Sequence, residues 1–525
     1  MILLLAAWSA SAAAFFFARG YTLYYGDAEA HLNIARRIVD SRTPRSEQIG
    51  SVWLPLPHLL MAPLAASVTL WKSGLAGVIP SAICFVIAGG FLFAAARLVF
   101  GSDAAGVVAL GLFALNPNVM YLQSIPMSEP VFWAAEMGML YFTVRFCGSP
   151  KIGVRQPFSA KEPRKTESDT NFLGAVIGAG LACLAGTLSR YDGWFLVPFV
   201  TLFFFLSAPR RRMRVALIVG AIAALGPLAW LAHNWYWFGD PLYFLRGPSS
   251  AAGIQRGRAY PGYGDWKTAV IFYQSAAAWC AGPALRWIGG LGLVAAFARK
   301  AFWPLLFLAL PVIFYLWNIH SGDSPIYVPN LWYGSYYNTR YGLAVIPLAA
   351  FASAALVTWT PPGARGWAAF VLIAAAGLPW LLHPTPERWI TWKESQVNSE
   401  DRREWTRRTA AFLSPRYRRG EGVFTTFGDP TGIYRTMGLP LHETLTWDND
   451  PQWMVTLRRP DLFLWEEWAV CVAGDPVQRT IHRARRAGLF YKLVDTIVVR
   501  DAPPIEIYRR SSRHENPVHQ GARRP

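Results

Sequence analysis

The chain has 525 residues, of which 53% are hydrophobic, 15% aromatic and 16% charged, and its mean hydropathy is +0.24. This proportion of apolar residues excludes an ordinary soluble protein and is typical of a polytopic membrane protein. The net charge of +18 does not predict a nucleic-acid partner, because long apolar runs separate the arginine-rich clusters, and the five cysteines show neither a disulfide framework nor metal-type spacing.

Apolar segments along the chain predict about eleven membrane spans, since a crossing helix needs about 20 mostly apolar residues. The first segment lacks the basic start and the cleavage site of a signal peptide, so we expect it to remain a span. The predicted spans are residues 2–18, 76–99, 104–122, 127–146, 172–189, 194–208, 215–235, 282–298, 302–317, 341–359 and 366–382.

Short basic loops orient these spans. If the spans alternate, the basic loops at residues 151–165, 210–214, 299–300 and 365 all fall on one side, which is therefore predicted to be cytoplasmic, together with the N-terminus. We expect the protein in the cytoplasmic membrane. The opposite, outer side then carries the long polar and aromatic loops, at residues 20–53, 123–128, 190–192, 238–267 and 318–340.

One apolar run, residues 54–71, is not counted as a span. Counting it would place the first polar loop on the other side of the membrane from the remaining polar loops, and Pro55, Pro57 and Pro63 disfavour a straight helix. We expect a broken helix lying in the outer interface.

The region after the last span is predicted to be a separate α/β domain. Strand-like segments begin at Val423, Asp461, Asp495 and Ile505, and the segment from Val477 has helical spacing up to a glycine. We expect a membrane domain at residues 1–382, an extracytoplasmic domain at 383–510 and a disordered tail at 511–525. This domain has no recognisable catalytic pattern and is expected either to brace the membrane part or to help select the molecule on which that part acts.

The stretch YGDAEAHLNIARR, residues 25–37, follows the first span directly. Read as a helix over residues 27–40, this part of the chain places Asp27 and His31 on a packed face, and Glu29, Asn33, Arg36, Arg37 and Asp40 on a polar face. Asp27 lies in the first turn, where the positive end of the helix dipole favours a carboxylate, and is a candidate base. The alternative is that Asp27 is only a helix cap and that Glu29 belongs to a solvated face.

A series of short segments in a fixed order points to a family. After the first span come GDAEAHLNIARRIVDSRTP, the proline-flanked run at 54–71, LNPNVMYLQSIPMSEP, LSRYDGWFLVP and FGDPLYF. In this order, over residues 1–382, the chain resembles the GT-C membrane glycosyltransferases, and among them the bacterial protein-O-mannosyltransferase-like and aminoarabinose-transferase-like enzymes. The resemblance implies a mainly α fold, a helical transmembrane bundle with in-plane helices in the first outer loop, here followed by the small α/β domain.

The resemblance also implies an activity. Such enzymes take a sugar from a polyprenyl-phosphate carrier and pass it to a protein, lipid or glycan acceptor on the outer side of the membrane, and an aspartate of the first outer loop acts as the general base. Asp27 occupies the matching position, with Glu29 as a second catalytic candidate. The family's adjacent Asp-Glu pair is interrupted here by Ala28, which leaves the role of Glu29 open.

Because a lipid phosphate leaves easily, its departure requires charge stabilisation more than a proton, and arginines are the candidates. Arg340 stands where an outer loop meets a span, and it is predicted to bind the phosphate together with Tyr337, with Asn338 in support; alternatively Arg340 anchors the interface. Arg190 is a second phosphate candidate. Its neighbour Asp192 supports the site or forms a salt bridge with it.

Glu129 stands between Pro126 and Pro130 at the end of a span. The resemblance places an acid near the reaction site here, so Glu129 is a catalytic candidate. The alternative is that its carboxylate only satisfies free N–H groups at the start of a helix.

The loop at residues 246–267 is basic and glycine-rich. Arg256 and Arg258 are predicted to bind donor phosphate, with the loop acting as a lid, or else to touch anionic headgroups.

No cofactor is certain from the sequence, although a divalent metal is possible. Its candidate ligands are Asp27, His31, Glu47 and His58, but no spacing of these residues defines a site. If no metal binds, His31 and His58 remain candidates for substrate support.

Two other functions compete with sugar transfer. A transporter or lipid flippase would place polar or broken helices at the bilayer midplane, whereas the ionisable residues here gather at the outer ends of spans. A non-enzymatic envelope assembly protein would bind its partners through the C-terminal domain. The sequence identifies neither the sugar nor the acceptor.

Overall fold

The computed structural model describes residues 1–148, 165–255, 257–322, 324–426, 428, 430–486 and 488–511. Several predictions fall outside these residues: nearly all of the basic loop at 151–165, Arg256, and the tail after Ser511. The described chain forms two compact units.

The two units are interleaved along the sequence. The first contains Met1–Ala28, Ser51–Met61 and Gly74–Asn398. The second contains Glu29–Gly50, Ala62–Ser73 and the chain from Ser399 onwards. Two pieces of the first loop therefore fold with the C-terminal region, which the sequence did not indicate, and the domain boundary at residue 382 stays a prediction.

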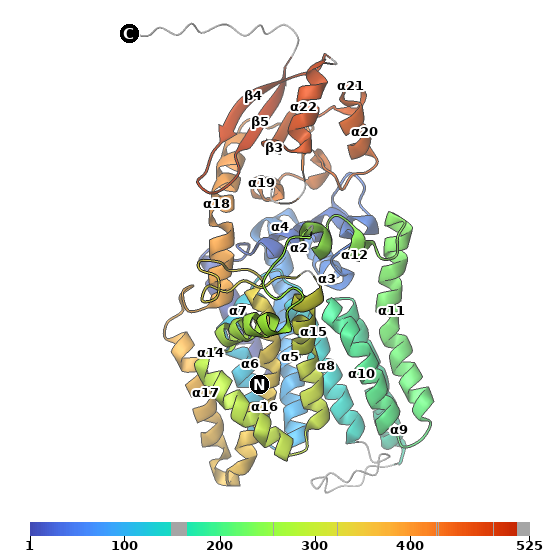
Figure 1. The fold of residues 1–525 in the computed structure, drawn as a ribbon, viewed down its shortest axis with the longest axis vertical. Coiled ribbons are helices and arrows are strands. Elements are labelled where there is room, and N and C mark those ends of the chain that lie inside the picture. The colour runs from blue at the N-terminus through green and yellow to red at the C-terminus, as the bar shows by residue number, and fades with distance from the viewer. Residues whose placement is uncertain are drawn as a thin grey trace. The chain divides into compact units, whose positions relative to one another are not determined.

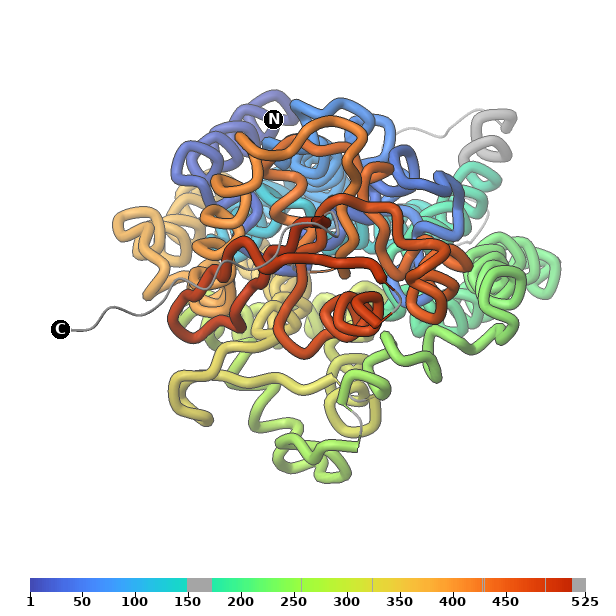
Figure 2. Tube along the Cα trace, turned by 90° about the horizontal axis from the view of Figure 1, so that it is seen from above, coloured from blue at the N-terminus to red at the C-terminus, as the bar shows by residue number. Residues whose placement is uncertain are grey.

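The first unit is a helical bundle. Figure 1 shows α5, α8, α10 and α11 side by side, and α11 and α17 lie at opposite edges in both views (Figure 1, Figure 2). Helix α5 packs on α8, α8 on α9, and α14 on α16. Its helices are α1 (Ile2–Ala18), α5 (Leu75–Phe100), α6 (Asp103–Ala114), α7 (Pro117–Gln123), α8 (Glu129–Cys147), α9 (Lys165–Thr187), α10 (Tyr191–Ser207), α11 (Arg212–Phe238), α12 (Tyr243–Arg246), α13 (Ala251–Gln255), α14 (Trp266–Ala298), α15 (Phe302–Ser321), α16 (Val345–Ala354) and α17 (Arg365–Leu381).

The predicted fold class is confirmed: the chain is a multi-pass membrane protein with a small α/β region. Among the described residues, six helices are long and apolar enough to cross a membrane, or up to seven if α6 and α7 count as one span. The apolar helices Ile2–Ala18, Phe172–Thr187 and Tyr191–Ser207 are shorter. The predicted span at 127–146 falls on α8, which carries charged residues at Glu129, Glu136 and Arg145.

One predicted span is bent, and another begins at a break in a longer helix. The segment 104–122 forms α6 and α7 at an angle of 69°, because the Asn116 side chain caps α7 and Pro117 occupies its first turn. Helix α14 breaks at Gly282, whose φ of 72° favours glycine. The freed carbonyl of Cys280 accepts hydrogen bonds from Asn116 Nδ2 at 2.9 Å and Asn118 Nδ2 at 3.1 Å.

The run at 54–71 is broken, as predicted. It forms α3 (Pro55–Ala65) and α4 (Val68–Ser73), and neither is long enough to cross a membrane.

The second unit contains a five-stranded sheet in the order β2-β1-β3-β5-β4. Strand β1 pairs in parallel with β2 and β3, whereas β5 is antiparallel to both β3 and β4. Phe424, Ala469 and Tyr508 contribute to its buried core. The elements are β1 (Val423–Thr425), β2 (Thr444–Leu445), β3 (Trp468–Val472), β4 (Phe490–Ile497), β5 (Ile505–Ser511), α19 (Thr431–Met437), α20 (Gln452–Arg458), α21 (Pro460–Phe463) and α22 (Pro476–Arg486); α18 (Ile390–Leu413) leads into this unit.

The strands predicted at Val423, Asp495 and Ile505 are present, and so is the helix from Val477. The strand predicted at Asp461 is wrong. Pro460 and Asp461 begin the short helix α21 instead, since both residues favour a first helical turn, and the strand follows as β3.

Candidate functional site

Asp27 stands in the first turn of α2 (Gly26–Val39), a helix that the sequence predicted almost to its ends. Its Oδ2 atom lies 2.5 Å from Arg340 NH2, and its side chain is 37% exposed. Within the described part of the chain, the structure gives its other oxygen, Oδ1, no hydrogen-bond partner. Asp27 therefore presents one fixed and one available carboxylate oxygen.

Arg340 lies in the 3₁₀ helix η3 (Thr339–Ala344) and joins Asp27 to a second acid. Its Nε atom is 3.1 Å from Glu129 Oε1, in the first turn of α8. The guanidinium carbon lies 5.0 Å from the ring centre of Tyr25 and 5.4 Å from that of Tyr341. Two carboxylates and two aromatic rings thus orient this one cation.

Glu394 of α18 fixes the chain just before Arg340. Its carboxylate accepts the backbone N–H groups of Asn338 at 2.8 Å and Thr339 at 2.9 Å, and the hydroxyls of Thr339 and Tyr25 also donate to it. Burial raises the pKa of Glu394, although the charge of Arg340 acts in the opposite direction. Sequence reasoning missed Glu394 because its partners are 55 or more residues away along the chain.

Arg190 and Asp192 extend the same cluster at the start of α10. Arg190 NH1 lies 2.9 Å from Glu129 Oε1, and Arg190 NH2 donates to the Tyr315 hydroxyl at 2.6 Å. That hydroxyl donates to Asp192 Oδ2 at 3.1 Å. The predicted salt bridge between Arg190 and Asp192 is present at 3.3 Å.

Glycine allows this turn to approach the neighbouring helix. A Cβ atom on Gly193 would lie 2.4 Å from the Gly186 carbonyl of α9, so only glycine fits at residue 193. The close contact fixes the start of α10 and, with it, the Arg190–Asp192 turn.

Several charged atoms of the cluster lie within ion-pair distance but without hydrogen-bond alignment. Glu129 Oε1, Arg190 Nε, Asp192 Oδ1 and Arg340 Nε are buried and have no hydrogen bond of acceptable geometry. A buried charge needs directed hydrogen bonds to offset its desolvation, so these four atoms are held by charge attraction without the full stabilisation of aligned hydrogen bonds.

Glu29 belongs to the second unit, whereas the cluster belongs to the first. Its Oε1 lies 2.8 Å from Arg435 Nε, and its side chain is 22% exposed, less than that of Asp27. The polar face predicted for Glu29 thus makes an ion pair, and the alternative of a solvated face does not hold. Asn33 on the same predicted face is buried, and its Oδ1 accepts a hydrogen bond from Trp71.

The remaining metal candidates do not form a ligand set. Glu47 pairs with Arg45 at 2.7 Å, His31 is buried in the second unit, and His58 is buried in the first, stacked on Trp53. Over the described ranges, no three His, Cys, Asp or Glu side chains gather as metal ligands. Arg340 already supplies the positive charge that Asp27 and Glu129 share, so the residues present do not fit a divalent metal.

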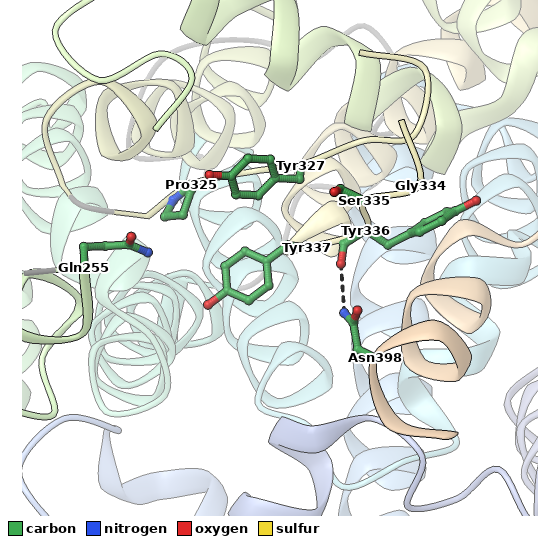
Figure 3. Close-up of a pocket in the computed structure, with 8 residues that line it drawn as sticks. All are labelled: Gln255, Pro325, Tyr327, Gly334, Ser335, Tyr336, Tyr337 and Asn398. Carbon is green, nitrogen blue, oxygen red and sulfur yellow. Dashed lines mark hydrogen bonds between the residues drawn. The ribbon is translucent and has the colours of Figure 1, made fainter. Parts of the chain in front are cut away.

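Tyr337 and Asn338 precede Arg340 by three and two residues. Asn338 is buried, and its Nδ2 atom donates to the Pro325 carbonyl at 3.0 Å. Tyr337 is 44% exposed and lines a pocket of about 370 Å³ that also includes Gln255 (Figure 3). Arg258 is exposed on the same loop as Gln255.

No protein-family model matches the sequence, and no curated protein sequence matches it. The fold, however, is similar to that of solved ArnT structures, as the predicted resemblance to aminoarabinose-transferase-like enzymes implies. The chain is similar to ArnT from Cupriavidus metallidurans in the apo state, with 13% identity over 95% of this chain and 98% of that chain and a TM-score of 0.51.

ArnT from the same organism bound to undecaprenyl phosphate gives 13% identity, 96% and 97% coverage and a TM-score of 0.54. The apo oligosaccharyltransferase of Archaeoglobus fulgidus gives 10% identity, 90% and 69% coverage and a TM-score of 0.48. At these identities the likeness shows the fold alone.

Proposed function

We propose that this chain is an integral-membrane glycosyltransferase that moves a sugar from a polyprenyl-phosphate carrier to an acceptor, with Asp27 as the general base. The observation that carries the proposal is Asp27 itself: Arg340 holds Oδ2, while Oδ1 is left to a substrate. The ArnT-like fold supports it, and one of the similar ArnT structures is bound to undecaprenyl phosphate.

In the proposed reaction, an acceptor hydroxyl or amide attacks the anomeric carbon of the donor sugar. The acceptor proton passes to Asp27 Oδ1, and the bond between the anomeric carbon and the phosphate oxygen breaks, so the electron pair leaves with the phosphate. The reaction consumes no redox equivalent and requires no further co-reactant.

Arg340 and Arg190 are proposed to stabilise the leaving phosphate. A guanidinium has five N–H donors, and the hydrogen bonds to Asp27, Ser128 and Tyr315 use only some of them. Carboxylates of the cluster already form ion pairs with Arg340 and Arg190. The donor phosphate therefore has to compete with these carboxylates for the two guanidinium groups. Binding of the donor is therefore expected to loosen the contacts of Glu129, which are poorly aligned already.

The proposal includes an orientation of the chain in the membrane. The basic loops lie on the cytoplasmic side with the N-terminus, and the second unit lies outside a bacterial inner membrane. We assign Glu29 the role of holding α2 through its ion pair with Arg435, and not a role in proton transfer. This is our proposal for the role of Glu29, which Ala28 separates from Asp27.

A donor panel tests the function. The purified protein in liposomes is incubated with radiolabelled polyprenyl-phosphate sugars and with membrane extracts that contain protein, lipid and glycan acceptors. Transfer from at least one donor is expected. If the folded protein transfers sugar from none of them to any acceptor class, the proposal is wrong.

A further inference from the structure

We propose that the pocket beside Tyr337 binds a neutral pyranose ring of the acceptor. This inference rests on the proposed function and adds a substrate class to it: an acceptor that presents a sugar to the enzyme. The pocket measures about 370 Å³, within the usual range for small-molecule sites.

Two tyrosine rings form the framework of the pocket. Tyr327 and Tyr337 pair their backbones in an antiparallel bridge with two N–H···O bonds of 3.0 Å each. Their ring centres lie 6.4 Å apart at an interplanar angle of 58°. Figure 3 shows both rings at the pocket, whereas the ring of Tyr336 points away and its carbonyl accepts from Asn398 Nδ2 at 2.8 Å.

The chemistry of the lining fits a sugar better than a phosphate or an ionic peptide. Tyrosine rings offer a flat apolar face with a hydroxyl at the edge, which matches the C–H face and the hydroxyl rim of a pyranose. Gln255, Ser335 and Asn398 add neutral donors and acceptors, and none of the described residues that line the pocket is charged.

The position of the pocket assigns it to the acceptor. Tyr337 is three residues before Arg340, and Glu394 fixes the chain between them through the N–H groups of Asn338 and Thr339. Burial raises the pKa of Tyr337, and the negative charge of Asp27 raises it further, so this phenol lies within the field of the proposed base. A ring bound against Tyr337 therefore lies three residues along the chain from Arg340.

Binding is measured on the full chain in detergent by saturation-transfer NMR with a panel of methyl glycosides. The protein carries Asp27→Asn, so the result does not depend on catalysis. At least one glycoside is expected to receive saturation.

Tyr327→Phe is expected to retain binding, and Tyr327→Ala to weaken it by about tenfold, which is about 1.4 kcal/mol. Tyr333→Ala is the matched control, because Tyr333 is fully exposed on the same loop and does not line the pocket.

The proposal is overturned if no glycoside receives saturation, or if Tyr327→Ala binds as the control does while its thermal unfolding is unchanged. Steady-state kinetics distinguish whether the bound sugar belongs to the acceptor or to the donor. Tyr327→Ala is expected to raise the KM of the acceptor. A rise in the KM of the donor alone would contradict the acceptor assignment. Glycoside binding without sugar transfer by the wild type would instead contradict the proposed function and leave this pocket as a saccharide site.

Discussion

A single arginine connects the two acids at the centre of the site. Arg340 contacts Asp27 through NH2 and Glu129 through Nε, and this geometry depends on the planar fork of a guanidinium. Lysine keeps the positive charge but offers one compact ammonium group, which cannot hold both carboxylates in these positions.

Arg340→Lys is therefore expected to lower kcat by about 100-fold, because Asp27 loses its orientation and the leaving phosphate loses a donor. Steady-state kinetics with donor and acceptor varied separately measure the effect. Arg388→Lys, at an exposed arginine of the same unit, serves as the control. A variant with wild-type kcat would show that Arg340 only anchors the interface.

Sequence reasoning found the charged residues of the cluster but not the polar residues that hold them. Asp27, Glu129, Arg190 and Arg340 were predicted one at a time, since charge next to an apolar span is conspicuous. Their supports could not be predicted, because Tyr315 lies 123 residues from Asp192 and Glu394 lies 369 from Tyr25. Such contacts depend on how the helices pack.

One further acid escaped prediction although the sequence carried a signal for it. Glu136 is 3% exposed within α8, and its Oε1 has no hydrogen-bond partner. An acid inside an apolar run is a functional candidate by that fact alone.

At the scale of one element, helix α2 belongs to both units. Its first turn, with Asp27, belongs to the first unit, and the remainder from Glu29 belongs to the second. In the second unit Arg435 Nε contacts Glu29 at 2.8 Å, and Arg435 NH1 donates to the Lys72 carbonyl at 2.8 Å. Asp27 and Glu29 are two residues apart in α2. We therefore expect that loss of the contact between Glu29 and Arg435 disturbs this helix and, with it, Asp27.

Glu29→Gln and Arg435→Gln are each expected to lower kcat by about fivefold, and the double variant by no more than either alone, since both remove one contact. A double-mutant cycle on kcat measures the coupling. The exposed pair Glu404 and Arg407 provides the control substitutions. If Glu29 took part in proton transfer, Glu29→Gln would be far more damaging than Arg435→Gln, and the positioning role would be rejected.

The range of α2 was predictable, but its environment was not. The expected helix at residues 27–40 agrees with α2 within one residue at each end, whereas the wheel did not show what its polar face contacts. Asn33, Arg36 and Arg37 are buried on that face, where Ala65, Trp71 and Asp448 bind them. A pattern of polarity does not distinguish a solvated face from one that packs through ion pairs.

For the whole molecule, hydropathy predicted the helical bundle and strand patterns predicted the α/β sheet. The interleaving of the two units was not predictable, because residues 29–50 and 62–73 join the C-terminal region through contacts across several hundred residues. The orientation in the membrane remains a prediction from the basic loops.

Single reporter cysteines test that orientation. Asp501→Cys, in the exposed turn before β5, is expected to react with a membrane-impermeant maleimide on intact spheroplasts. Arg212→Cys, at the start of α11, is expected to react only after permeabilisation. The native cysteines are buried or half-buried, so the wild-type chain gives the blank. The reverse labelling pattern would invert the proposed topology.

The central claim is that Asp27 takes the acceptor proton, and Asp27→Asn tests it most directly, since the amide keeps the shape of the side chain but is not a base. Single-turnover transfer of labelled sugar is measured at saturating donor, with carrier binding measured in parallel and Asp501→Asn as the control. The account predicts a loss of transfer of about 100-fold or more with donor binding largely retained. Near-normal transfer by Asp27→Asn would contradict it.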